Sequence, residues 1–133
     1  MKILLIKPFN LSDHIQPSLG LGYLATAVRA NNDVRILDCI KDKIKINHLR
    51  KIIVNYKPDL IGLQCYTFDL KFVKEALNIV KDINRKIITV VGGPHSSALP
   101  QQTMEYFGKN LDFAFRGECE RSFPALIDLL IGN

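Results

Sequence analysis

The chain has 133 residues, of which 47% are hydrophobic and 23% are charged, and its formal net charge is +5. This length fits one domain with a buried core, and the composition excludes an intrinsically disordered chain. The apolar runs are far shorter than the roughly 18 residues of a membrane span, and the basic residues lack interleaved aromatic residues, so we expect neither a membrane span nor a nucleic-acid partner.

Strand and helix patterns alternate five times along the chain. Strands are predicted at residues 2–7, 34–37, 60–64, 86–91 and 112–116. Helices are predicted at residues 19–30 and 46–56, after an N-cap at Thr67, at residues 100–108, and from residue 122 onwards. This order predicts an α/β fold: a Rossmann-like, flavodoxin-type sheet of five parallel strands in the order 2-1-3-4-5, with helices on both faces.

Two local features indicate a cytoplasmic protein without a metal site of its own. The first apolar run ends at Lys7-Pro8 with no small-residue cleavage site after it, which argues against a signal peptide. The three cysteines, Cys39, Cys65 and Cys119, are widely spaced and odd in number, which argues against a disulfide framework. No CxxC or CxxxCxxC spacing occurs, so no metal or iron–sulfur cluster is expected in this chain.

The unusual residues follow the predicted strands at their carboxyl ends. In an open parallel sheet these ends meet at one edge, and ligands bind there. Glycines at that edge let a bulky flat ligand approach the backbone closely. We therefore predict one binding site, to which the loops after four of the strands contribute residues 8–10, 19–22, 65–67, 92–97 and 117–118.

The same segments resemble the cobalamin-binding amino-terminal domain of cobalamin-dependent radical S-adenosylmethionine enzymes. The resemblance rests on Pro8, on Leu19 to Ala25, on Leu37-Asp38, on Pro58 to Leu63, on Val90 to His95, on Arg116-Gly117-Glu118, and on Phe123-Pro124 with Leu126. It covers essentially the whole chain. It implies that cobalamin is bound by Pro8, Gly20, Gly22, Cys65, Tyr66, Thr67, Gly92, Gly93, Pro94, His95, Arg116, Gly117 and Glu118.

The resemblance also implies a longer protein, of which residues 1–133 form the amino-terminal domain. The family includes methyltransferases and the anaerobic magnesium-protoporphyrin IX monomethyl ester oxidative cyclases, and methyl transfer and cyclisation both stay open. In the family a carboxyl-terminal radical S-adenosylmethionine barrel carries the CxxxCxxC motif, the 4Fe-4S cluster and S-adenosylmethionine. That motif is absent here, so we expect this chain to have no catalytic residue of its own and to partner such a barrel.

Two positions depart from related patterns. Methionine synthase and the mutases use DxHxxG after the first strand, where the histidine ligates cobalt, whereas here Asp13 and His14 are adjacent. We therefore expect cobalamin in the base-off form without a histidine ligand, and a solvated His14. Cys119 stands where the family often has a second glycine.

Other interpretations of these residues stay open. The segment from Gly20 to Ala25 matches a GxGxxA dinucleotide fingerprint with Asp38 after it, although that fingerprint needs its first glycine directly after the strand. A non-catalytic interaction module that has lost its ligand is the third possibility. His95 either lines the site or bonds within its own turn, and Glu118 either contacts the ligand or faces a helix amino end.

Overall fold

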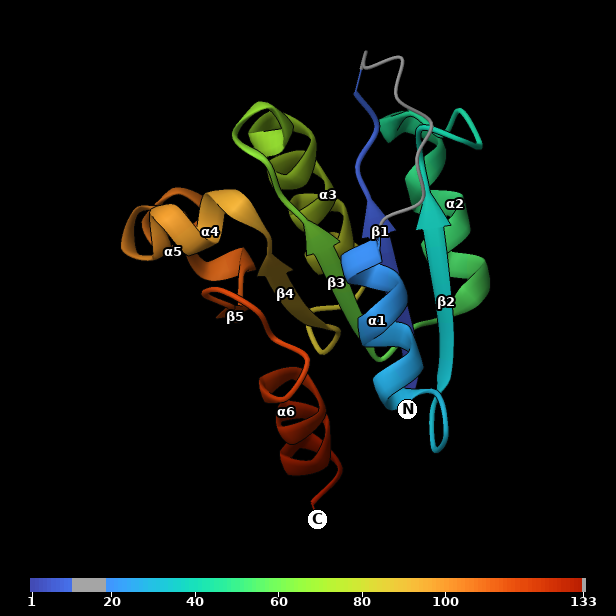
Figure 1. The fold of residues 1–133 in the computed structure, drawn as a ribbon. Coiled ribbons are helices and arrows are strands. Elements are labelled where there is room, and N and C mark those ends of the chain that lie inside the picture. The colour runs from blue at the N-terminus through green and yellow to red at the C-terminus, as the bar shows by residue number, and fades with distance from the viewer. Residues whose placement is uncertain (11–18, 133) are drawn as a thin grey trace.

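Five strands form one fully parallel sheet in the computed structural model, which describes residues 1–10 and 19–132. They are β1 (Lys2–Lys7), β2 (Asp33–Asp38), β3 (Leu60–Gln64), β4 (Ile88–Gly92) and β5 (Phe113–Ala114). Their order is β2-β1-β3-β4-β5, and every pair is parallel (Figure 1). The predicted flavodoxin-type fold class is therefore confirmed.

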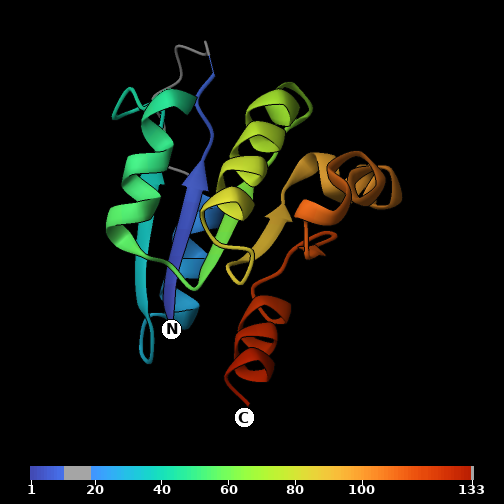
Figure 2. The ribbon, with the colours of Figure 1, turned by 180° about the vertical axis from the view of Figure 1, so that it is seen from behind.

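Helices cover both faces of this sheet. They are α1 (Leu19–Val28), α2 (Ile46–Tyr56), α3 (Leu70–Ile83), α4 (Pro94–Ala98), α5 (Pro100–Phe107) and α6 (Ser122–Ile131), with two 3₁₀ turns, η1 (Thr67–Asp69) and η2 (Gly108–Asn110). Helices α1 and α6 lie on one face, and α2 and α3 lie on the other, as the opposite views show (Figures 1 and 2). No helix of the described residues is long and apolar enough to cross a bilayer.

Strand β1 shows why the sheet has two cores. Leu4 and Ile6 pack into the cluster under α2 and α3, whereas Ile3 and Leu5 pack into the cluster under α1 and α6. All four side chains are buried, because a central parallel strand is covered on both faces. In the sequence, the continuous apolar run of β1 indicates a strand that is buried on both faces.

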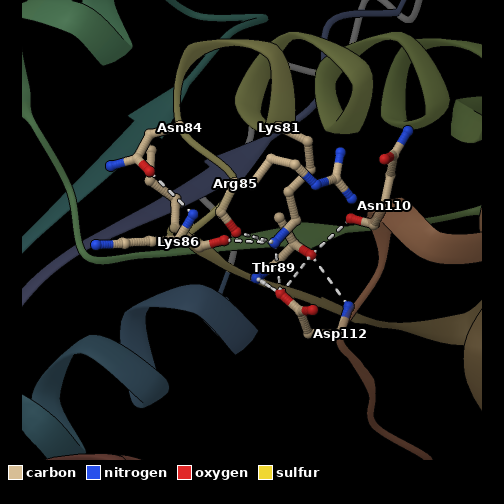
Figure 3. A network of polar contacts seen from close by, with 8 residues as sticks. Lys81, Asn84, Arg85, Lys86, Thr89, Asn110 and Asp112 are labelled. Atoms are coloured by element: carbon tan, nitrogen blue, oxygen red, sulfur yellow. Dashed lines mark hydrogen bonds and ion pairs between the residues drawn. The ribbon is translucent and has the colours of Figure 1, made fainter.

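A polar network closes the amino end of the sheet, away from the predicted site (Figure 3). The Nζ of Lys81, a residue only 6% exposed, donates to the Ile87 carbonyl at 2.6 Å and to the Asp112 carboxylate at 2.7 Å. The same carboxylate oxygen accepts the Thr89 N–H at 2.9 Å. Burial raises the pKa of Asp112, but the hydrogen bonds from Lys81 and Thr89 outweigh it, so the pKa lies below its ordinary value.

Three elements differ from the prediction. Strand β5 has only two residues, and Gly117 in the turn that follows has a φ of 70°. An unpredicted short helix, α4, begins at Pro94, where a proline fits the first helical position. The prediction of Thr67 as a helix N-cap was wrong: Asp69 holds that position of α3, and the Thr67 hydroxyl lies 3.2 Å from Nδ1 of His95.

Candidate functional site

A cavity of about 280 Å³ lies on the sheet face that α1 and α6 cover. Its floor comes from three adjacent strands, through Leu5, Gly62 and Val90. One wall is the start of α1, and the opposite wall comes from Phe115, residues 117–120 and Phe123 of α6. The cavity therefore runs from the middle of the sheet to its carboxyl edge, where the sequence predicts a site.

Gly62 gives the floor its depth. A Cβ atom at this position would lie 2.9 Å from Cδ2 of Leu5, closer than such atoms approach in real structures. Both residues line the cavity. Any side chain at Gly62 would therefore displace Leu5 or fill the space above β3. The sequence prediction missed Gly62, although an isolated glycine inside an apolar strand is a known sign of close approach.

Gly93 brings the turn after β4 against the end of β3. Its φ of 115° and ψ of −171° lie in a region that is essentially restricted to glycine. A Cβ atom there would lie 3.0 Å from the Cys65 carbonyl oxygen. That oxygen accepts the His95 N–H at 3.1 Å, so two neighbouring loops share backbone bonds. Gly92 has room for a side chain, because the atom nearest to a Cβ there would be Cβ of Phe115, at an ordinary contact distance of 3.9 Å.

Hydroxyl groups of α4 fix the segment that forms the opposite wall. The Ser96 hydroxyl donates to the Phe115 carbonyl at 2.8 Å, and the Gly117 N–H donates to the Ser97 hydroxyl at 2.8 Å. The Phe115 ring packs edge-on against the Phe123 ring, with centroids 6.0 Å apart. The turns after β4 and β5 thus lie side by side at the carboxyl edge of the sheet, as the predicted binding site requires.

The turn after β3 is held to both of its neighbours. Asp69 accepts hydrogen bonds from Nδ2 of Asn10 at 3.2 Å and from the Tyr66 N–H at 3.0 Å. On the other side, the Thr67 hydroxyl meets His95. Burial raises the pKa of Asp69, although these hydrogen bonds and the positive charge of Lys7 act in the opposite direction. Burial, followed by the charge of Asp69, raises the pKa of Cys65 to about 12, so this thiol stays protonated.

The structure brings about half of the predicted residues to the cavity. Those that line it are Gly20, Tyr66, Gly92, Gly93, Pro94, Gly117 and Glu118. Those that lie outside its lining are Pro8, Gly22, Cys65, Thr67, His95 and Arg116. Of the open alternatives for His95, the structure shows a buried ring that contacts Thr67 and does not line the cavity. Whether any of these residues contacts cobalamin stays a prediction.

Several lining residues were not among the predicted cobalamin contacts. They are Leu5, Leu21, Leu24, Gly62, Leu63, Gln64, Val90, Phe115, Cys119, Glu120 and Phe123. Most are apolar residues of strands and helices, whose periodicity marks them as core but not as cavity wall. Within residues 1–10 and 19–132, no group of three His, Cys, Asp or Glu side chains gathers that could hold a metal ion. His14 lies outside the described residues.

The dinucleotide interpretation fails on the local geometry. Gly20 is the second residue of α1, so it does not form the tight turn directly after β1 that a pyrophosphate needs. Asp38, which would bind a ribose, accepts the backbone N–H groups of Ile40 and Lys41, each at 3.1 Å. Its carboxylate also lies 3.8 Å from Nζ of Lys7. These contacts give Asp38 a structural role.

Known proteins place the chain in a family. A family model described as the B12 binding domain matches residues 11–127. An uncharacterized methyltransferase, PH0819, from Pyrococcus horikoshii is 35% identical over 98% of this chain and 29% of its own length. The anaerobic magnesium-protoporphyrin IX monomethyl ester cyclase of Rubrivivax gelatinosus is 28% identical over 96% of this chain and 24% of its own length.

A solved structure agrees with these matches. The radical S-adenosylmethionine methyltransferase TsrM from Kitasatospora setae, with cobalamin and a [4Fe-4S] cluster bound, superposes with a TM-score of 0.75 at 26% identity. The match covers 99% of this chain and 25% of TsrM. The chain thus spans about a quarter of the length of its relatives. It belongs to the B12-binding domain family, as a cobalamin-binding domain of the kind that cobalamin-dependent radical S-adenosylmethionine enzymes carry.

Proposed function

We propose that the cavity between α1 and α6 receives the nucleotide tail of cobalamin, and that the corrin ring lies at the carboxyl edge of the sheet. One observation carries this proposal: the cavity opens where the glycine turns after β4 and β5 meet. Its volume is near the lower end of the roughly 300–1,000 Å³ usual for ligand pockets. It therefore suits a bicyclic base better than a whole corrinoid.

The chemistry of the lining fits that base. Leu5, Leu24, Val90 and Phe123 offer an apolar surface to a flat ring. Gly92 leaves space for it, because a Cβ atom there would meet only an ordinary contact at 3.9 Å. Glu118, which is exposed at the wall, supplies a polar contact at the mouth of the cavity.

A tail held in this cavity is away from the cobalt, so we propose base-off binding without a histidine ligand. In the described residues, His95 is 7% exposed, faces Thr67 and lies outside the cavity lining. His48 lies on α2, on the opposite face of the sheet. These two positions support the proposed absence of a histidine ligand.

The intact protein is proposed to be a larger enzyme. When bound, cobalamin supplies methyl-transfer chemistry or tunes a radical reaction, and the protein provides binding, orientation and electrostatics. We propose that a radical S-adenosylmethionine barrel, with its 4Fe-4S cluster and S-adenosylmethionine, covers the carboxyl edge. Both methyl transfer and ester cyclisation fit this arrangement, and the chain itself supplies the cofactor-binding part.

Titration of the 133-residue chain with hydroxocobalamin tests the proposal. The visible absorption should show saturable binding, and cobinamide, which lacks the nucleotide tail, should bind at least about tenfold more weakly. In the cob(II)alamin form, the electron paramagnetic resonance spectrum should lack nitrogen splitting from an axial base. Equal affinity for the two corrinoids would refute the tail site, and no binding at all would refute the function.

A further inference from the structure

Asp69 is a buried carboxylate that bonds both within its own helical segment and to the loop after β1. It is 2% exposed and occupies the N-cap position of α3, yet its side chain makes no capping bond to that helix. Oδ2 accepts the Tyr66 N–H, which is the capping-box bond of η1, and Oδ1 accepts a hydrogen bond from Nδ2 of Asn10. A carboxylate is costly to bury, because it loses its hydration. Capping of η1 accounts for one carboxylate oxygen of Asp69, but it does not account for the bond to Asn10.

The bonds of Asp69 belong to a cross-connection between three adjacent loops. Strands β1, β3 and β4 are neighbours in the sheet, and their loops carry Asn10, residues 66–69 and His95 respectively. Asn10 joins the turn after β3 on one side. On the other side, the Thr67 hydroxyl lies within hydrogen-bond distance of Nδ1 of His95. The backbone N–H of His95 in turn donates to the Cys65 carbonyl. The turn is thus held from both directions by side chains that do not line the cavity.

The turn carries an exposed aromatic pair. The rings of Tyr66 and Phe68 stack with centroids 5.3 Å apart and an interplanar angle of 10°. Tyr66 is 40% exposed and lines the cavity, whereas Phe68 is 68% exposed and lies outside it. Two large rings on a short surface turn have few packing contacts to order them. The hydrogen bonds of Asp69 and Thr67 therefore fix the position of the turn, and with it the position of Tyr66 in the cavity lining.

We infer that Asn10 and Asp69 are positioning residues. They hold Tyr66, which lines the cavity, in place for the cofactor, and they do not contact the cofactor themselves. This inference rests on the proposed cobalamin site. A wall that is already ordered loses less conformational entropy when the ligand binds, so the affinity is higher. The proposed effect is on the dissociation constant for cobalamin, with the fold retained.

An exchange of the two side chains tests the inference. Asn10→Asp places two carboxylates against each other, which should displace the turn and weaken cobalamin binding about tenfold. Adding Asp69→Asn to that variant restores one amide and one carboxylate with their roles exchanged, since the new amide oxygen accepts the Tyr66 N–H. The double variant should return to within about threefold of the wild-type dissociation constant.

Controls separate this effect from a general loss of stability. Asn55→Asp makes the same charge change at an exposed position in the last turn of α2, and it should leave the dissociation constant unchanged. All constants are measured at a temperature at which circular dichroism shows every variant folded. If Asn10→Asp does not fold, Asn10→Ala, which removes the bond to Asp69 without adding a charge, should weaken binding about threefold or more.

The outcomes are distinct. Rescue by the exchanged pair supports the positioning role. If each substitution weakened binding independently, the two losses of binding free energy would add in the double variant instead of cancelling. Wild-type affinity in the folded Asn10→Asp or Asn10→Ala variant would overturn the inference while leaving the cobalamin site intact. Failure of the exchange to restore affinity would overturn it as well. A wild-type chain that binds no cobalamin would instead refute the proposed function.

Discussion

The substitution Gly93→Ala should destabilise the fold far more than the same change at the preceding glycine. Gly93 has a φ of 115° and a ψ of −171°, a region that costs other residues about 1–3 kcal/mol. The added Cβ atom would also lie 3.0 Å from the oxygen and 3.2 Å from the nitrogen of Cys65. Both are backbone atoms of a buried residue at the end of β3, so neither can move aside cheaply.

The two terms give the expected magnitude. Overpacking against fixed atoms costs roughly 1–3 kcal/mol, which brings the total loss to about 2–6 kcal/mol. A domain of this size has a free energy of unfolding of about 5–15 kcal/mol, so the change is large. Gly92→Ala is the matched control, because its Cβ atom would meet Phe115 only at 3.9 Å and its φ is not in the positive range. Its expected cost is less than about 1 kcal/mol.

Urea unfolding followed by circular dichroism measures both variants against the wild type. A loss below about 1 kcal/mol in Gly93→Ala, or equal losses in the two variants, would refute the backbone argument. The result also guides any attempt to block the cavity. A bulky residue at Gly93 tests folding before it tests binding, whereas Gly92→Val places its methyl groups at the lining without the backbone strain.

Three further outcomes are expected. Lys81→Met should cost about 2 kcal/mol in urea unfolding at pH 7, below the usual 3–5 kcal/mol for breaking a buried pair because the partner, Asp112, is partly exposed. That cost should shrink as the pH falls below about 4: the folded pKa of Asp112 lies below its ordinary value of 3.8, so its stabilising contribution is present above that value and is lost on protonation. A cost independent of pH would contradict this assignment. Iodoacetamide should label the half-buried Cys119 before the fully buried Cys65, whose pKa is about 12, and cobalamin should protect Cys119, as mass spectrometry of the labelled peptides can show. Gly62→Val should weaken cobalamin binding about tenfold and leave cobinamide binding unchanged; equal losses for both corrinoids would argue against a tail above β3.

The fold could be predicted because its signals are local. The apolar run of β1 and the helical spacing of Val73, Ala76, Leu77 and Val80 in α3 are visible without any partner, and the structure buries all of them. The order of the strands follows from the alternation of elements and the handedness of their crossovers. The elements that were missed depend on other segments. Helix α4 exists because the turn after β4 folds back onto Cys65.

The glycine turns at the edge of the sheet could be predicted from the sequence, but the cavity floor could not. Gly92, Gly93 and Gly117 break the pattern of their surroundings, so they were visible in the sequence. Leu5 and Val90 look like ordinary core residues, and only the missing side chain of Gly62 between them turns core into cavity. Thr67 and His95 were expected to contact the ligand. The structure shows that their polar groups meet each other, which no spacing in the sequence reveals.

The position of the cavity follows from how the two faces of β3 are filled. On the α2 and α3 face, Ile61 and Leu63 belong to a closed cluster with α3. On the other face, Leu60 fills the amino half together with Ile3 and Ile127, and Gly62 comes next along the strand. Between Leu60 and Gln64, this face of β3 therefore has no Cβ atom to fill the space between α1 and α6. This is the space that we propose for the base of the nucleotide tail, and it leads along the sheet to the glycine turns at the carboxyl edge.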